Sequence, residues 1–414
     1  MTPAPYPAIA GGRPLFAEPV PIARPALPDA DSLAVELRSL VESGRLTNGE
    51  TVERFERAAA QFLGVEHCVA VSSCTSGLML VERAMGLRGR VIVPSFTFFA
   101  TAHSLLWNQL EPVLVDCDPV SWNLDPEAVE RVLRRSGGIG ISAILAVHVY
   151  GNPAAAEELE WMARRAGVAL LFDAAHAFGA RRAGRQVGGF GDAEVFSFSP
   201  TKPLAAGEGG LVATGNPELA RRLRAARNYG DSGDYDCRLL GLNARMTEMG
   251  AALALAALPL VEEGMAHRNR LARIYEEYLG SEPGLGFQGL RRQDLSTRKD
   301  FSILVDEARF GVSAPLLAQA LAAENVQTRR YFDPPLHRQR LYARYWRPQL
   351  DPLDHTERLS RGVLSLPIHT HLSEAGALAI ARRMVEIRDW LSGRAEPEPA
   401  QRESAGELAV EAIA

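Results

Sequence analysis

Phe196-Ser-Phe-Ser-Pro-Thr-Lys202-Pro-Leu-Ala-Ala-Gly-Glu-Gly-Gly210 joins an apolar, strand-like stretch to a glycine-rich turn, with a lysine between them. Lys202 is one of only two lysines among 45 basic residues. A lysine amine can lose its proton in a dry site and attack a carbonyl to form a Schiff base, which arginine cannot do. Because α/β proteins place their chemistry at the ends of strands, we expect Lys202 to be reactive rather than a leftover surface lysine. The other lysine, Lys299, lies in a polar run and is predicted to be on the solvated surface.

Seven short apolar runs bounded by turn residues indicate a β-sheet around this segment. They cover residues 68–72, 90–93, 111–115, 143–148, 169–172, 193–197 and 210–214. Helical patterns separate most of these runs, and two amphipathic helices at 31–43 and 51–62 precede the first. This alternation is typical of βαβ units. It predicts an α/β fold whose large domain holds a mostly parallel seven-stranded sheet covered by helices.

The remainder of the chain predicts a second, smaller unit. A helical stretch from 253 to 279, broken at Pro259, leads into a region with one strand-like run at 301–305 and helices at 314–324 and 373–391. We therefore expect an N-terminal arm (1–30), a large domain (31–262) and a small α+β C-terminal domain (263–393). The Pro-, Glu- and Ser-rich tail (394–414) is predicted to be disordered.

Composition narrows the class of protein. The formal net charge is −5 with both signs interspersed, which argues against a nucleic-acid or anionic-membrane partner. No apolar run approaches the roughly 20 residues that cross a bilayer, and no signal-peptide pattern opens the chain. The four cysteines lack metal-ligand spacing, so neither a metal site nor a disulfide framework is expected. A cytoplasmic enzyme is the expectation.

A second chemical signal lies at residues 70–78, Ala-Val-Ser-Ser-Cys-Thr-Ser-Gly-Leu, which run from a strand into a helix that begins near Thr75. Backbone N–H groups, the helix dipole and the hydroxyls of Thr75 and Ser76 can bind a phosphate there. The commoner role of such residues is to cap the helix, and the sequence leaves that alternative open.

Two further signals follow other strands of the same sheet. Asp173 ends the apolar run 169–172, and a buried carboxylate needs a partner; a protonated pyridine nitrogen, as in pyridoxal phosphate, is one, and a helix N-terminus is another. Phe98 follows the run 90–93 and can either stack on a planar cofactor or pack in the core. Because these signals and Lys202 all lie at the carboxyl ends of predicted strands, together they favour one pyridoxal-phosphate site.

Over nearly all of residues 30–390 the chain resembles the DegT-type nucleotide-sugar aminotransferases, a family of pyridoxal-phosphate enzymes with the type I fold. The resemblance rests on the lysine segment and on Ser73-Cys-Thr-Ser-Gly-Leu78, Pro94-Ser-Phe-Thr-Phe98, Asp173-Ala-Ala-His176 and Gly241-Leu-Asn-Ala-Arg-Met-Thr-Glu248. It implies an obligate homodimer with shared active sites. One departure is Ser199, where relatives often carry histidine.

The resemblance also implies roles for individual residues. Lys202 and Asp173 are the catalytic residues: Lys202 binds the cofactor covalently and Asp173 pairs with its ring nitrogen. The other cofactor contacts are His176 at the 3′-oxygen, Phe98 stacked on the ring, Thr75, Ser76 and Ser197 at the phosphate, and Asn243 reaching the phosphate from the neighbouring subunit.

The substrate is read from segments 241–246, 326–337 and 355–367, which are similar to those of enzymes that aminate C4 of dTDP-4-keto-6-deoxyglucose. The resemblance implies this nucleotide sugar, glutamate as amino donor, and deoxyamino-sugar biosynthesis for natural products. The candidate substrate contacts are Arg245, Arg329, Tyr331 and His337, although these arginines can equally be solvated or paired with acids.

Several functions other than amination of a 4-keto nucleotide sugar are also considered. A 3-keto sugar or a cyclitol such as scyllo-inosose stays open as the acceptor. Dehydration of a sugar is a further alternative, but relatives that became dehydratases replace the lysine with histidine. A nicotinamide dehydrogenase is disfavoured because no strand precedes a Gly-x-Gly-x-x-Gly turn. A binding protein would not need Lys202, Asp173 and a phosphate site together.

Overall fold

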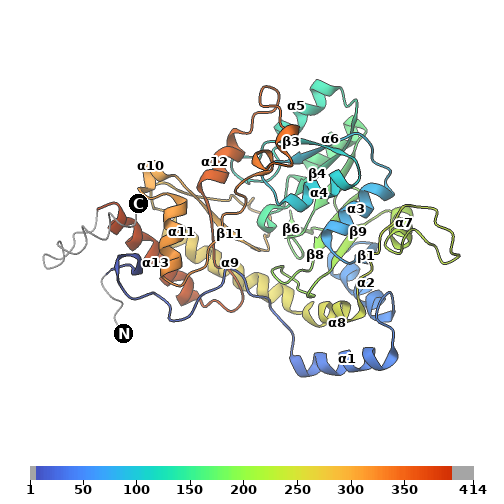
Figure 1. Cartoon of the computed structure of the whole chain (residues 1–414), viewed down its shortest axis with the longest axis horizontal. Helices are drawn as coiled ribbons and strands as arrows, with labels where there is room; N and C mark the ends of the chain where they lie inside the picture. Colours follow the sequence, from blue (N-terminus) through green and yellow to red (C-terminus); the bar gives the residue numbers. More distant parts are fainter. Residues whose placement is uncertain (1–5, 394–414) are drawn as a thin grey trace.

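The computed structural model describes residues 6–393 and contains a seven-stranded sheet beside a three-stranded one (Figure 1). Within the large sheet, β9 runs antiparallel to both neighbours and the other pairs are parallel. The strand order is β1 (His67–Val71), β9 (Gly210–Thr214), β8 (Ala193–Ser197), β5 (Ala169–Asp173), β4 (Ile141–Val147), β2 (Arg90–Pro94), β3 (Glu111–Val115). The predicted α/β fold with a mostly parallel seven-stranded sheet is confirmed, and each predicted strand coincides with an observed one apart from its ends.

Alternating side chains of the strands bury both faces of this sheet. In β2, for example, Val91 and Val93 pack toward one set of helices and Ile92 toward another. One face is covered by α3 (Cys74–Ala84), α4 (Phe99–Trp107) and α7 (Pro217–Ala226). The other is covered by α5 (Pro126–Ser136), α6 (Ala156–Ala166), α2 (Glu50–Leu63) and α8 (Glu248–Ala257). Because helices cover both faces of the sheet, the strand sequences are nearly continuous apolar runs and do not alternate between apolar and polar residues.

Helix α3 lies unusually close to the sheet, and two glycines permit this. A Cβ at Gly77 would lie 2.7 Å from Val195 Cγ1, and a Cβ at Gly210 would lie 2.5 Å from the backbone carbon of Ser73. Both distances are shorter than real Cβ contacts allow, so a larger residue at either position would push the start of α3 away from β8 and β9. The helix N-terminus is thereby fixed beside the carboxyl end of β8.

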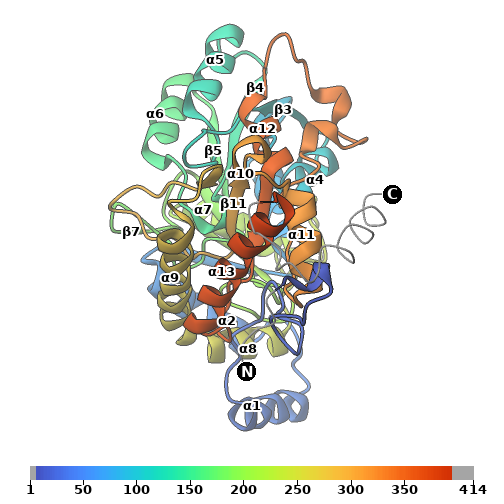
Figure 2. The same ribbon diagram turned by 90° about the vertical axis from the view of Figure 1, so that its left-hand side faces the viewer.

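The smaller sheet is antiparallel, in the order β10 (Leu285–Phe287), β11 (Phe301–Val305), β12 (Val363–Leu366). It shares a core with α9 (Leu260–Leu279), α11 (Ala314–Ala323) and α13 (Glu374–Leu391), and Figure 2 shows α9 and α13 side by side. The sequence predicted the central strand alone. The two outer strands were missed because β10 is three residues long and β12 follows a helix without an intervening turn residue.

The predicted break near Pro259 is confirmed, because α8 ends at Ala257, α9 begins at Leu260 and their axes differ by 58°. No single helix in residues 6–393 is long and apolar enough to cross a membrane; only this bent pair passes a test of length and composition. Helix α1 (Ala30–Ser43) lies at the edge of the molecule beside α8, as Figures 1 and 2 both show. The remaining elements are short: α10 (Glu307–Phe310), the hairpin of β6 (Arg181–Arg182) and β7 (Arg185–Gln186), and the 3-10 turns Ala8–Ala10, Val149–Gly151, Leu336–Arg338 and Ala343–Tyr345.

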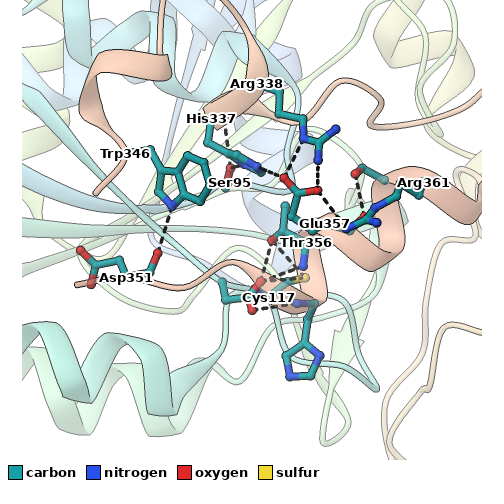
Figure 3. Close-up of polar contacts among 12 residues, drawn as sticks. Ser95, Cys117, His337, Arg338, Trp346, Asp351, Thr356, Glu357 and Arg361 are labelled. Carbon is teal, nitrogen blue, oxygen red and sulfur yellow. Dashed lines mark hydrogen bonds and ion pairs between the residues drawn. The ribbon is translucent and has the colours of Figure 1, made fainter. Parts of the chain in front are cut away.

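A polar network ties residues 336–362 to the ends of β2 and β3 (Figure 3). Asp116, just after β3, accepts hydrogen bonds from the N–H groups of His355 and Thr356 at the start of α12 (Asp354–Gly362), at 2.9 and 2.8 Å. Glu357 on the same helix binds His337 Nε2 at 2.6 Å and the guanidinium of Arg338. This part of the chain is thus anchored on the large sheet.

The predicted division of the chain is described only in part. Residues 1–5 of the expected arm and the expected tail (394–414) lie outside the described residues. The boundary at 262 falls inside α9, which continues from one unit into the other, and the division stays a prediction.

Candidate active site

Lys202 lies in the turn between β8 and β9 and lines a cavity of about 190 Å³ at the carboxyl ends of β5 and β8. The turn is held by hydrogen bonds from Phe198 N to Gly209 O (2.9 Å), Ala206 N to Phe198 O (2.8 Å) and Lys202 N to Ser199 O (3.0 Å). The cavity brings together most of the residues predicted from the strand ends: Thr75, Phe98, Asp173, His176, Ser197 and Lys202. Burial of the amine, and next the nearby charge of Lys299, lower the pKa of Lys202 from its usual value to about 8.

Asp173 presents a buried carboxylate to this cavity; the residue is 6% exposed. Its oxygens accept hydrogen bonds from Thr101 Oγ1 (2.7 Å), from Ala175 N (3.0 Å) and from the Cys74 thiol (3.7 Å). Burial raises the pKa of the Cys74 thiol well above its usual range, so all three donors are neutral. Within residues 6–393 no cation pairs with Asp173, although a buried carboxylate is costly without one. The site therefore fits a ligand that brings a cationic N–H group.

The N-terminus of α3 forms the opposite wall. Ser73 caps the helix: its Oγ accepts from Ser76 N, and Ser76 Oγ accepts from Ser73 N, both at 3.1 Å. The N–H groups of Cys74 and Thr75, the first two helical residues, have no acceptor among the described residues. They can bind an anion together with the Thr75 hydroxyl. Ser76 does not line the cavity and has the capping role that the sequence left open.

His176 and Phe98 complete the cavity. Tyr150 N donates to His176 Nδ1 at 3.2 Å, and burial lowers the pKa of His176 well below its usual value, so the ring is neutral. Because Nδ1 accepts, the proton of the neutral ring is on Nε2, which can donate to a ligand oxygen. Phe98 is 45% exposed and lies at the N-terminus of α4, tilted against Phe99 with ring centroids 3.9 Å apart. Its ring is available to a planar ligand.

Four other predicted contacts lie outside this cavity. Arg329 and Tyr331 line an adjoining cavity of about 360 Å³ that shares Thr97, Phe98 and Phe332 with it. Arg245 lines a cavity of about 450 Å³ beside α1 and α8 and donates to Asn228 Oδ1 at 2.7 Å. Asn243 is exposed and pairs through its backbone with Asn228.

The structure does not support His337 as a substrate contact. The residue is 2% exposed, its Nδ1 is 2.8 Å from Ser95 Oγ and its Nε2 is 2.6 Å from Glu357 Oε1. Both ring nitrogens are therefore occupied within the network of Figure 3.

The prediction for Lys299 is wrong. This lysine is 7% exposed, its Nζ forms an ion pair with Asp300 Oδ1 at 2.7 Å, and it lines a narrow cavity that Lys202 also lines. The polar residues around Lys299 are typical of an exposed segment. Its position just before the apolar strand 301–305 was the one indication of burial. Thr101, whose hydroxyl donates to Asp173, was not predicted from the sequence either. A threonine within a helix gives no sign that it contacts a residue 72 positions away.

Comparison with known proteins adds independent information. Residues 29–385 match the family described as DegT/DnrJ/EryC1/StrS aminotransferases. The dTDP-3-amino-3,4,6-trideoxy-alpha-D-glucose transaminase of Streptomyces venezuelae is 33% identical over 354 residues, which cover 85% of this chain and 90% of that protein. The dTDP-4-amino-4,6-dideoxy-D-glucose transaminase of Escherichia coli is 28% identical over 370 residues, covering 88% and 98%. A crystal structure of DesI in the presence of its TDP-sugar product is 39% identical, covers 94% of this chain and 98% of that one, and superposes with a TM-score of 0.86.

Proposed function

Since this chain belongs to the DegT/DnrJ/EryC1/StrS family and is a pyridoxal-phosphate-dependent nucleotide-sugar aminotransferase, we propose that the cavity around Lys202 is its active site. We further propose that the enzyme aminates dTDP-4-keto-6-deoxyglucose with glutamate as the amino donor. The observation that carries the site is Asp173: a buried carboxylate with only neutral donors around it, facing the amine of Lys202 across one cavity.

The residues present fit the cofactor. Asp173 is placed to accept the ring N–H, which supplies the missing cation, and the N–H groups of Cys74 and Thr75 are placed for the phosphate. Ser197, buried and on the same cavity, adds a hydroxyl. His176 Nε2–H would donate to the 3′-oxygen, and Phe98 would pack against the ring. When bound, pyridoxal phosphate withdraws negative charge from the carbon that loses a proton.

Lys202 does the acid–base work in this proposal. An amine can accept a proton only in its neutral form, and a pKa of about 8 makes that form accessible near neutral pH, where an ordinary lysine is almost fully protonated. The same amine binds the cofactor covalently between turnovers and is released when the donor amine replaces it. It then takes the proton from the donor's α-carbon and returns one at the cofactor C4′ position.

The nucleotide sugar is proposed to enter through the adjoining cavity. Arg330 is committed to Asp333 (2.6 Å) and to the carbonyl oxygens of Ser360 and Arg361, whereas Arg329 is exposed and has no ion pair among residues 6–393. Arg329 is therefore free to bind a diphosphate, for which its planar guanidinium is well suited. Tyr331 lies beside it on the same cavity.

Support for dTDP-4-keto-6-deoxyglucose comes from the Escherichia coli relative named for a 4-amino sugar and from DesI, whose product is a TDP-sugar. The Streptomyces venezuelae relative is named for a 3-amino sugar, so amination at C3 is the specific alternative. The test is to assay the 4-keto and 3-keto nucleotide sugars and scyllo-inosose side by side with glutamate. Preferential turnover of the 3-keto sugar or of scyllo-inosose refutes the C4 assignment, and release of water without amination would show a dehydratase.

A homodimer with shared sites is part of the proposal. Helix α1 and its surroundings expose large apolar side chains, including Leu27 (57%), Val35 (73%) and Val41 (61%), which is the surface expected of an interface. Asn243 is exposed and lies two positions before Arg245, which lines the cavity beside α1 and α8. We propose that Asn243 reaches the phosphate site of the partner subunit.

A further inference from the structure

The two lysines of this chain, 97 positions apart in sequence, line the same narrow cavity on the inner side of the active site. Its other walls are Thr201 and Pro203 from the lysine turn, Arg268 from α9 and His369 after β12. Everywhere else the chain uses arginine as its basic residue. An arginine-rich composition explains why lysine is rare, but it does not explain why both lysines line the same cavity.

Lys299 is held rigidly as a charged group. Its backbone N–H donates to Tyr150 O at 3.0 Å, its Nζ lies 2.7 Å from Asp300 Oδ1, and it lies 5.5 Å from the centre of the Tyr331 ring. The side chains of Lys299 and Asp300 are 6% and 3% exposed. Such a buried pair contributes little to stability compared with apolar residues of the same volume, so its presence calls for another role.

Other ionisable groups face Lys202 from every element around it. Two of them are neutral at physiological pH, because burial raises the pKa of the Cys74 thiol and lowers that of His176. Burial likewise lowers the pKa of His369 to about 4, so this ring is neutral too. The charged groups are Asp173 on β5, Glu208 in the turn before β9, Arg268 on α9, Arg24 in the N-terminal segment, and the pair of Lys299 and Asp300 before β11. In the proposed site Asp173 is matched by the cofactor ring, and of the remaining charged groups Lys299 and then Asp300 have the largest influence on the amine of Lys202.

We propose that Lys299, held by Asp300, is a positioning residue whose positive charge makes the neutral, proton-accepting form of the Lys202 amine more accessible. After burial, Lys299 is the largest influence that lowers the pKa of Lys202, and Asp300 partly opposes it. The inference rests on Lys202 being the residue that binds the cofactor.

The test is a pH titration of the visible absorption of the bound cofactor in the holoenzyme, which reports the protonation of the nitrogen that Lys202 contributes. Lys299→Met should raise the titration midpoint by about one pH unit or more, the shift that a like charge at close range produces. Lys299→Arg, which keeps the charge, should stay near the wild-type midpoint. Arg292→Met removes an exposed cation from the same segment and should change nothing.

Unchanged midpoints in Lys299→Met would overturn the inference, and so would an equal shift in Lys299→Arg, because packing rather than charge would then be responsible. If Lys299→Met does not fold, the double variant Lys299→Met/Asp300→Asn leaves no unpaired buried charge. It should show a smaller rise, since the opposing charge is lost as well, and an unchanged midpoint in that variant also overturns the inference.

One additional measurement separates this inference from the proposed site. Reduction of the holoenzyme with sodium borohydride should place a pyridoxyl group on the peptide that contains Lys202. If the adduct is on Lys202 but the titration midpoints do not change, only the proposed role of Lys299 is refuted. If the adduct is on another residue, the site assignment itself is refuted.

Discussion

Replacing Asp173 with asparagine removes one charge from the active site and almost no volume. Thr101 Oγ1 and Ala175 N can still bond to the amide, because the hydroxyl can accept as well as donate and Ala175 N keeps a carbonyl acceptor. We therefore expect the variant to fold and its free energy of unfolding to change by only about 1 kcal/mol. The phosphate contacts at α3 are untouched, so the cofactor should still bind.

The catalytic rate of the Asp173→Asn variant should nevertheless fall strongly. Asp173 is 6% exposed and forms no ion pair within the described residues, so its proposed pairing with the ring nitrogen would belong to the buried class, for which losing one partner costs about 3–5 kcal/mol. At 1.36 kcal/mol for each tenfold change, this corresponds to a fall in kcat of roughly a hundred- to several-thousand-fold.

The assay is single-turnover conversion of the cofactor with glutamate, followed by its absorption, on protein whose cofactor content has been measured. Thr101→Val serves as the matched control: it removes one neutral hydrogen bond to the same carboxylate and should slow the reaction far less, by about tenfold. A rate for Asp173→Asn within tenfold of wild type would show that Asp173 merely supports the turn before Ala175, and the electronic role would be refuted.

Four further predictions follow from the same geometry. Lys202→Ala should lose turnover, because the amine that binds the cofactor is gone; mass spectrometry after borohydride reduction of the wild type should find the adduct on the Lys202 peptide, and an adduct on Lys299 would contradict this. Asn243→Ala should retain the cofactor less well, and mixing it with Lys202→Ala should restore some activity, since one site of each mixed dimer carries neither change; no recovery after verified subunit exchange would indicate sites built within one chain. The half-reaction that starts from the pyridoxamine form should accelerate as pH rises through about 8, because the neutral amine of Lys202 is the proton acceptor; a flat profile in single-turnover experiments would argue against it. Gly210→Ala should raise the dissociation constant of the cofactor by displacing the start of α3, while Gly215→Ala, where a Cβ meets nothing within 4 Å, should not, and equal constants would show that α3 does not bind the phosphate.

The large sheet could be predicted from sequence because its strands are buried on both faces. Such strands form uninterrupted apolar runs, and turn residues mark their ends. The carboxyl ends of parallel strands meet at one edge of a sheet, so Asp173, Phe98, Thr75 and Lys202 could be placed together without knowing any contact. That is why the cofactor side of the site was predictable.

The substrate side was not predictable for the opposite reason. Arg245, Arg329 and His337 lie on irregular segments whose paths are set by tertiary contacts, such as the anchoring of His337 by Ser95 and Glu357. These three basic residues have three different surroundings. Arg245 lines a cavity beside α1, Arg329 lines a cavity beside Phe98, and His337 lies in the protein interior. The predicted exposure of Lys299 was wrong for the same reason, because its neighbours in sequence are polar although the residue itself is buried just before β11.

The burial of both lysines has a practical consequence for handling the protein. Reagents that couple to amines, including biotin esters, fluorophore esters and many cross-linkers, will find no fully exposed lysine, since Lys299 is buried and Lys202, the only other one, is partly buried and lines the same narrow cavity. Apart from the N-terminal amine, any such labelling that does occur reports access to the active site and should be blocked by the cofactor. Attachment to a surface or a dye is better directed to Cys237, which is exposed while the other three cysteines are buried.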